Sequence, residues 1–321
     1  MDEPDGAAAG IGAIGVIGLG DMGAAMARSM IAAGLRLVVH DIRAEAMAPL
    51  VELGATAVGS ITAVAEQADV ISIVVLDDGQ VRHVVEALAP VAHPGTTLIV
   101  HSTVQPSTVV ELAGDVAERG IDLIDATVSG GAEKGALGTL TVMIGGPDEV
   151  VRRCWPVFEA VGSELFHLGP VGAGATAKVV NNLLSLGSYA LQLEAMQIAA
   201  AYGIDEDAVT TVVTASQGDS RGIRTWGRMD RIRRGRREGR DAAAVYEQIS
   251  KDLRTAAKVG GALGLVLPIT ASAAALLPSK LAERDRALDA LAAERRIPRC
   301  DACRQELAAP FRAAGRHPEC M

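Results

Sequence analysis

The stretch GVIGLGDMGAAM, residues 15–26, decides the fold of the first half of the chain. It places the pattern Gly18-x-Gly20-x-x-Gly23 directly after the β-branched run 13–19 and before a helical segment. A GxGxxG pattern alone is a weak signal, but a strand before it and a helix after it are the context that a dinucleotide-binding turn requires. The glycines allow a tight turn and let the backbone approach a pyrophosphate at the helix N-terminus. The predicted cofactor-binding residues of this turn are Gly18, Leu19, Gly20, Asp21, Met22 and Gly23.

An acidic residue follows the next expected strand. Asp41 closes the run 35–40, about twenty residues beyond the glycines. An acid at this place accepts hydrogen bonds from the adenosine ribose hydroxyls and repels a 2′-phosphate, so NAD is favoured over NADP. Arg43 leaves NADP open as the alternative, because an arginine can reach a phosphate. The other alternative is a glycine-rich turn that binds nothing.

The first half of the chain alternates β-branched runs with amphipathic segments, which predicts βαβ units and a largely parallel sheet. After about residue 169 the pattern changes. Residues 175–202 contain no proline and have an apolar majority, which predicts one long, mostly buried helix. The expected strands are 13–19, 35–40, 70–75, 97–101, 121–126 and 140–145.

The expected fold is an α/β N-terminal domain followed by an all-α domain with a small Cys/His appendage. We expect a disordered N-terminus over 1–12, a cofactor-binding domain over 13–170, a helical substrate and dimerisation domain over 171–297, and a tail over 298–321.

Composition excludes several classes of protein. Hydrophobic residues make up 49% of the chain and charged residues 21%, as in a globular protein. A formal charge of −9 argues against general binding to nucleic acid or anionic membranes. The segment 259–278 is long enough to span a bilayer, but Pro268 and its many Ala and Gly residues favour two packed helices. The acidic N-terminus and the few, clustered cysteines predict a cytoplasmic protein.

The helix expected over 175–202 carries a polar stripe. If it faces the carboxyl edge of the sheet, Lys178 lies where a nicotinamide and its substrate would meet. Burial lowers the pKa of a lysine from about 10.4, so that its neutral amine can take a proton from a substrate hydroxyl. A lysine that reaches the surface or pairs with a carboxylate is the alternative, and spacing alone does not choose. The stripe follows spacings of four, three, four and three: Lys178, Asn182, Ser185, Tyr189 and Gln192.

A second glycine-dense segment favours the catalytic interpretation of Lys178. The stretch DATVSGGAEKGALGTLTVMIGG, residues 125–146, begins at the end of an expected strand and contains Ser129-Gly130-Gly131. Successive glycine amides and a serine hydroxyl form a concave donor site that suits a carboxylate. A loop without a ligand would not explain two glycine-dense segments at one edge of the sheet.

Five ordered motifs between about residue 13 and residue 270 resemble the β-hydroxyacid dehydrogenase family, which includes 3-hydroxyisobutyrate dehydrogenase and tartronate semialdehyde reductase in the 6-phosphogluconate dehydrogenase superfamily. The motifs are GLGDMGAAMARSMIAAG (18–34), STVQP (102–106), the 125–146 stretch, GAGATAKVVNN (172–182) and KDL (251–253).

The resemblance implies an NAD(P)-dependent oxidoreductase that transfers a hydride between nicotinamide and a small 3-hydroxy or 2-hydroxy acid or semialdehyde. It implies a Rossmann domain joined by a long helix to an all-α domain, and a homodimer or homotetramer. Lys178 would be the catalytic acid/base and Asn182 would orient the substrate. The carboxylate would bind at Ser129, Gly130 and Gly131, and the cofactor would also meet Thr103 and Lys251.

Three features depart from the family. The family usually has proline at Thr127 and a residue other than histidine at His101, and both positions are expected at the pocket rim, so the exact substrate stays open.

The segment 221–240 carries nine arginines against two acids. It is expected to be a solvated face, with a site for a phosphorylated or multiply acidic substrate as the alternative.

The C-terminal tail is the third departure. The spacing of its cysteine and histidine residues is close to that of a structural zinc site. A small appendage without a hydrophobic core would need a bound metal to be stable. A tail with incidental thiols is the alternative. Cys154 is expected to be a core residue. The predicted zinc ligands are Cys300, Cys303, His317 and Cys320.

Two other functions compete with the dehydrogenase. An imine or ketone reductase on the same scaffold is disfavoured because those relatives generally lack the catalytic lysine. A non-catalytic dinucleotide-binding module would not need Lys178, Asn182 and the Ser129 motif together.

Overall fold

The computed structural model describes residues 12–237 and 241–296. Within them the chain forms two compact units: unit 1 holds residues 12–183 and 258–266, and unit 2 holds residues 184–257, without 238–240, and 267–296. The predicted N-terminal segment 1–12, apart from Gly12, and the tail 298–321 lie outside the described residues.

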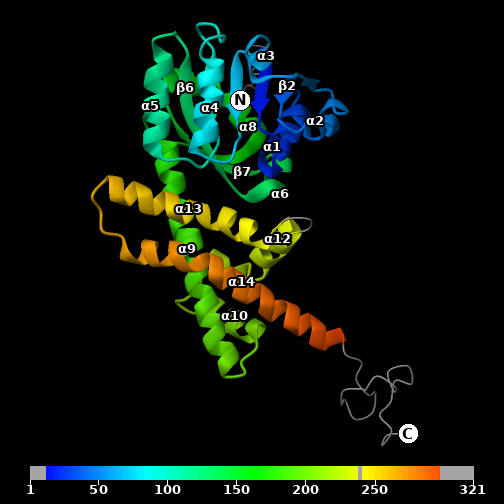
Figure 1. Ribbon diagram of the computed structural model, residues 1–321, viewed down its shortest axis with the longest axis vertical. Helices are drawn as coiled ribbons and strands as arrows, with labels where there is room; N and C mark the ends of the chain where they lie inside the picture. Colours follow the sequence, from blue (N-terminus) through cyan, green and yellow to red (C-terminus); the bar gives the residue numbers. More distant parts are fainter. Residues whose placement is uncertain (1–11, 238–240, 297–321) are drawn as a thin grey trace, which may run out of the picture. The chain divides into compact units, whose positions relative to one another are not determined.

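Unit 1 is built on an eight-stranded sheet with the order β3-β2-β1-β4-β5-β6-β7-β8 (Figure 1). The first six strands in this order pair in parallel, as in a Rossmann fold, whereas β7 runs antiparallel to β6. The six predicted strands are present, but β3 and β8 were missed because neither is a buried β-branched run. The strands are β1 (Ile14–Ile17), β2 (Leu37–His40), β3 (Thr56–Ala57), β4 (Val70–Ile73), β5 (Thr97–Val100), β6 (Asp122–Ser129), β7 (Leu140–Gly145) and β8 (Gly162–His167).

Side chains alternate between the two faces of each central strand, so unit 1 has a hydrophobic core on both sides of its sheet. On β5, Ile99 joins the core with Met26 and Phe158, whereas Leu98 joins the core with Val85. The helices that cover these faces are α1 (Asp21–Ala32), α2 (Ala44–Val51), α3 (Ile61–Ala65), α4 (Asp78–Leu88), α5 (Pro106–Ala117), α6 (Gly131–Ala136), α7 (Asp148–Arg153) and α8 (Trp155–Val161).

The described residues of unit 2 form helices joined by turns and loops, with no strand among them. The predicted long helix is observed, but it is only partly buried, because Leu184, Leu191 and Ile198 on one side of it are exposed. The segment 259–278 forms parts of two helices that separate before Pro268, as predicted. Of the described helices, none combines the length and the apolar character that crossing a membrane requires. The helices are α9 (Ala173–Ala201, which begins in unit 1), α10 (Glu206–Thr214), α11 (Arg221–Arg224), α12 (Arg228–Arg237), α13 (Ala242–Ala262) and α14 (Pro268–Arg296).

The predicted combination of a Rossmann-type α/β part and an all-helical part is therefore confirmed. The chain passes from one to the other along α9, whose first turn lies against β6 and β7. This approach is so close that a Cβ on Gly174 would lie 2.2 Å from the carbonyl oxygen of Met143 and 2.8 Å from Oδ2 of Asp125. Only a glycine fits there without moving the backbone.

We expect Gly174→Ala to destabilise the protein by roughly 1–3 kcal/mol, the usual cost of overpacking a close contact. The matched control is Gly114→Ala in α5, where an added Cβ would meet nothing within 4 Å. That change should stabilise the protein by about 0.5–1 kcal/mol, because glycine is a poor helix former. Denaturant unfolding of both variants tests the expectation, and equal effects would contradict it.

Candidate active site

The three glycines of the β1–α1 turn have three different surroundings. A Cβ on Gly18, which has φ +92°, would lie 2.4 Å from the carbonyl oxygen of Val74. A Cβ on Gly23 would lie 1.9 Å from the carbonyl oxygen of Gly18, whereas a Cβ on Gly20 would meet nothing within 4 Å. The outer glycines thus permit the tight turn and the close packing of helix on strand, and the middle one leaves open space where a pyrophosphate approaches. The turn fits a dinucleotide.

Asp41 lies at the end of β2, next to this turn. Its Oδ2 accepts a hydrogen bond from the amide of Leu19 at 2.6 Å, and its Oδ1 accepts one from the amide of Arg43 at 2.9 Å. Burial acts to raise the pKa of Asp41, but these amides and the Arg43 guanidinium outweigh it, so the pKa is lowered. The carboxylate is therefore a fixed negative charge beside the cofactor turn, with an exposed arginine next to it.

The structure brings the predicted residues of unit 1 to one edge of the sheet. Because β1, β2, β5 and β6 are parallel, their carboxyl ends lie at the same edge, which carries the glycine turn, Asp41, Thr103 and Ser129. Gly130 and Gly131 follow Ser129 with φ of +143° and +82°. Such conformations favour glycine, which accounts for the pair in the sequence.

Lys178 and Asn182 lie on α9, beyond the turn that contacts β6. The Lys178 side chain is 9% exposed and that of Asn182 is 7% exposed. The side-chain nitrogen Nδ2 of Asn181 donates to Oδ1 of Asn182 at 3.0 Å. The predicted lysine is therefore buried on its helix rather than extended into solvent.

The remainder of the polar stripe has a different role. Tyr189 donates from its hydroxyl to Asp230 at 3.1 Å, and Gln192 donates to Ser220 at 3.1 Å. These contacts join helices within unit 2. Lys251 also belongs to unit 2, where its ammonium pairs with Asp252 at 2.9 Å, so its approach to the cofactor stays a prediction.

His101 and Thr127 are not at a pocket rim, which corrects the expectation from the sequence. Thr127 has no exposed surface, and its hydroxyl donates to the carbonyl oxygen of Gly174 at 2.9 Å. His101 is buried between strands, donating from Nδ1 to the carbonyl oxygen of Ala126 at 2.6 Å. Burial lowers the pKa of His101 to about 4, although the bond to Ala126 opposes the shift. Both residues connect strands and helix from within.

Asp125 is a site-supporting residue that the sequence did not single out. Its carboxylate is fully buried and accepts hydrogen bonds from the amides of Gly172 and Ala175, each at 2.6 Å. Burial raises the pKa of Asp125 to about 6, while these amides act in the opposite direction. The sequence contained a signal for this role, namely an acidic residue inside a strand predicted to be buried. A buried carboxylate needs hydrogen-bond donors nearby, so such a residue indicates a structural contact.

The arginine-rich segment is not simply a solvated face. Arg233 is fully buried and pairs with Asp285 at 2.6 Å and Asp230 at 2.8 Å. Arg237 pairs with the other oxygen of Asp285 at 2.5 Å, and the Tyr246 hydroxyl donates to that oxygen at 2.7 Å. These arginines hold α12 against α13 and α14, so they are already neutralised by carboxylates. Cys154 is fully buried, as predicted.

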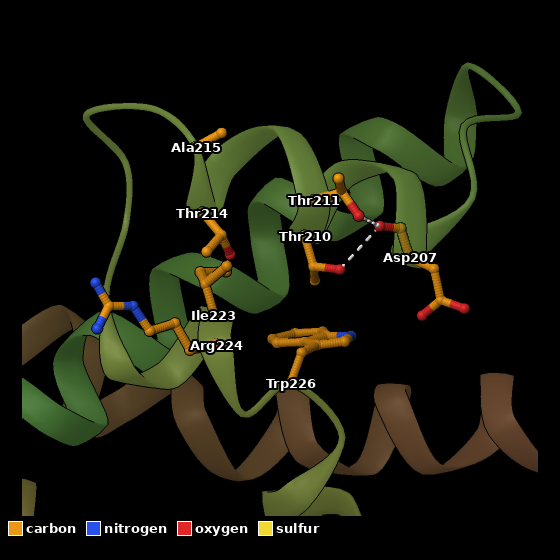
Figure 2. Close-up of a pocket in the computed structure, with 8 residues that line it drawn as sticks. All are labelled: Asp207, Thr210, Thr211, Thr214, Ala215, Ile223, Arg224 and Trp226. Atoms are coloured by element: carbon orange, nitrogen blue, oxygen red, sulfur yellow. Dashed lines mark hydrogen bonds between the residues drawn. The ribbon is translucent and has the colours of Figure 1, made fainter.

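Unit 2 also has a surface hollow of about 560 Å³ between α10 and the segment after it. In Figure 2 the Trp226 ring forms one side of this hollow, below Thr210 on α10. None of the predicted site residues lines the hollow, and the indole nitrogen of Trp226 already donates to Glu206 at 2.7 Å. We therefore assign it no part in the chemistry.

The zinc prediction is corrected. Across residues 12–237 and 241–296, no group of three or more His, Cys, Asp and Glu side chains has an arrangement that could hold a metal ion. The family model and the relatives that this chain matches also give zinc no support. The predicted ligands, Cys300, Cys303, His317 and Cys320, lie outside the described residues.

Two family models together match most of the chain. Residues 13–169 match the NAD binding domain of 6-phosphogluconate dehydrogenase, and residues 172–296 match the NAD-binding domain of NADP-dependent 3-hydroxyisobutyrate dehydrogenase. The NAD-dependent L-serine dehydrogenase of Pseudomonas aeruginosa is 32% identical, over 85% of this chain and 94% of that enzyme. The chain belongs to the β-hydroxyacid dehydrogenase family.

Further members of the family support this assignment. The L-threonate dehydrogenase of Escherichia coli K12 is 35% identical, over 81% of this chain and 86% of that enzyme. The crystal structure of a 3-hydroxyisobutyrate dehydrogenase from Salmonella typhimurium aligns with a TM-score of 0.71 and 33% identity, over 83% of this chain and 93% of that one. As a β-hydroxyacid dehydrogenase, the protein is an NAD(P)-dependent oxidoreductase that acts on a CH–OH group.

The competing functions have less support. An imine reductase from Myxococcus stipitatus aligns with a TM-score of 0.60 over 86% of this chain and 94% of that one, but at 17% identity the likeness shows a shared fold alone. A non-catalytic dinucleotide-binding module is not supported, because the family relatives at 32% and 35% identity are dehydrogenases.

Proposed function

We propose that Lys178 is the general acid/base of this dehydrogenase. The observation that supports it is the burial of Lys178 on α9, one turn beyond the residues that bond to β6. Strand β6 ends at Ser129, which Gly130 and Gly131 follow. A buried amine suits proton transfer to a bound hydroxy acid.

In the oxidising direction, the neutral amine of Lys178 takes the proton from the substrate hydroxyl. In the reducing direction, the ammonium of Lys178 returns that proton to the carbonyl oxygen. A bound nicotinamide supplies the hydride acceptor or donor. Ser129 and the amides of Gly130 and Gly131 hold the substrate carboxylate, and Asn182 orients the substrate, so that the reacting atoms are close when the proton moves.

We assign the cofactor to the glycine turn, Asp41, Thr103 and Lys251, and we take 13–170 as the cofactor domain and 171–297 as the substrate and dimerisation domain. The relatives named above act on L-serine and L-threonate, both small hydroxy acids. A small hydroxy acid is accordingly the substrate class. NAD is the favoured cofactor because the Asp41 charge opposes a 2′-phosphate.

We also propose a homodimer formed along α9. Five exposed residues of this helix in unit 2, together with Tyr202 directly after it, recur at alternating spacings of four and three, and none of them is charged. The four large ones are between 65% and 83% exposed. In an antiparallel pair of such helices Leu191 would face Ala195, Ser188 would face Ile198 and Leu184 would face Tyr202. Each of these contacts would occur twice, as an isologous interface requires. The six residues are Leu184, Ser188, Leu191, Ala195, Ile198 and Tyr202.

Lys178→Ala should reduce turnover of a hydroxy acid by at least about 100-fold, the usual contribution of an acid/base group. The dissociation constant for NAD should stay within about twofold, since α9 is not part of the glycine turn. The exposed Lys258 provides the matched control, and Lys258→Ala should keep full activity. Absorbance of reduced nicotinamide and cofactor titration measure both quantities, and equal loss of turnover and cofactor affinity would refute the role.

Asp41→Asn should improve kcat/KM with NADP by roughly tenfold relative to NAD, a change of about 1.4 kcal/mol in cofactor discrimination. The reason is loss of the negative charge that faces the ribose. Asp115→Asn, at an exposed position in α5, serves as the control and should leave the ratio unchanged. A ratio that stays the same in both variants would show that Asp41 does not select the cofactor.

Leu191→Glu should convert the dimer to a monomer, because it places a charge on each side of the proposed interface. Val212→Glu, in α10 at a site 65% exposed and off the stripe, is the control and should remain dimeric. Sedimentation equilibrium distinguishes the two states. A wild-type monomer, or a Leu191→Glu dimer, would exclude this interface.

A further inference from the structure

We propose that Thr127 is a positioning residue for Lys178: together with the Asp125 carboxylate, its hydroxyl fixes the first turn of α9 on strand β6. The inference rests on the proposed acid/base role of Lys178, and it adds the residue that sets where this amine is held.

Three side-chain hydrogen bonds connect β6 to three residues at the start of α9 or directly before it. Oδ1 of Asp125 accepts from the amide of Gly172 at 2.6 Å, and Oδ2 accepts from the amide of Ala175 at 2.6 Å. Thr127 donates from Oγ1 to the carbonyl oxygen of Gly174 at 2.9 Å. Neither Asp125 nor Thr127 has exposed surface, so water does not compete for these bonds.

The Thr127 bond leads directly to Lys178. In an α-helix the amide of each residue donates to the carbonyl four positions earlier, so the amide of Lys178 and the hydroxyl of Thr127 meet at the carbonyl oxygen of Gly174. Lys178 lies about 6 Å further along the helix axis, since each residue rises about 1.5 Å. A shift of the first turn would therefore move the Lys178 backbone with it.

The same strand face also leads to the proposed carboxylate site. Alternate residues of a strand point to one face, so Asp125, Thr127 and Ser129 share a side of β6. Ser129 lies roughly 6.6 Å beyond Thr127 along the strand. One strand thus holds both the helix that carries the amine and the first residue of the proposed carboxylate site, and it fixes the separation of the two groups.

The atoms where β6 and β7 meet the start of α9 are closely packed. A Cβ on Gly145, opposite Asp125 in the β6–β7 pair, would lie 2.7 Å from Oδ1 of Asp125 and 2.8 Å from the amide nitrogen of Ala173. The Thr127 bond is therefore made at a junction where backbone and side-chain atoms are already closely packed.

The test compares Thr127→Val, which removes the hydroxyl and keeps the branched shape, with Thr127→Ser, which restores the donor. We expect Thr127→Val to lower kcat for hydroxy acid oxidation by about tenfold, because displacement of a reacting group by a fraction of an ångström slows the chemical step. KM for the hydroxy acid and the dissociation constant for NAD should stay within about twofold, and Thr127→Ser should recover kcat to within about twofold of wild type.

Thr97→Val is the matched control. Thr97 is also a fully buried strand threonine whose hydroxyl has a partner, Arg153 at 2.7 Å, but it begins β5 at the opposite edge of the sheet. This variant should lower the melting temperature about as much as Thr127→Val while keeping kcat within about twofold of wild type. A kcat loss of the same size in both would show that Thr127 contributes stability alone.

The outcomes separate the two proposals. If Lys178→Ala retains turnover, the acid/base assignment fails and the positioning role fails with it. Three other outcomes overturn only the positioning role, provided that Lys178→Ala is inactive. They are an unchanged kcat in Thr127→Val, a raised KM in place of a lowered kcat, and a kcat in Thr127→Ser as low as that of Thr127→Val.

Discussion

The close contact between β6 and the first turn of α9 is the constraint on which the site depends. Helix α9 begins in unit 1, where hydrogen bonds from β6 hold its first turn. Gly174 permits the approach because it has no Cβ, and Asp125 makes the approach favourable because its carboxylate satisfies amides that a helix N-terminus leaves without partners. Lys178 lies within one helical turn of these contacts, so they also determine where its backbone is held.

Buried charges in the two units are stabilised in different ways. Asp125 is compensated by backbone amides, so its carboxylate binds the helix itself rather than another side chain. Arg233 is compensated by Asp230 and Asp285, which come from α12 and α14. A buried ion pair adds little net stability, but removing one partner leaves an uncompensated charge. The arginine-rich segment therefore specifies how the helices of unit 2 fit together.

The sequence predicted what depends on local pattern. The glycine turn, the six β-branched strands and the long helix follow from spacing over a few residues, and all are present. The surroundings of Arg233 and Thr127 depend on Asp285 and Gly174, which lie 52 and 47 residues away in the chain. Periodicity reports which face is buried and does not report what lies opposite it. Hence Arg233 was expected in solvent, and Thr127 was expected at a rim.

The cofactor-binding part and the proposed substrate-binding part of the site depend on different features of the chain. This difference is consistent with one fold that serves several hydroxy acids. The cofactor turn depends on backbone conformation and on missing Cβ atoms, as at Gly18 and Gly23, where any side chain would collide with a carbonyl oxygen. The proposed substrate end combines the glycine amides after β6 with side chains carried by α9, and the α9 side chains can change without breaking the cofactor turn. Relatives at 32% and 35% identity accordingly act on L-serine and L-threonate. The proposed positioning role of Thr127 belongs to this second end, because its bond to Gly174 acts on the start of α9 and not on the cofactor turn.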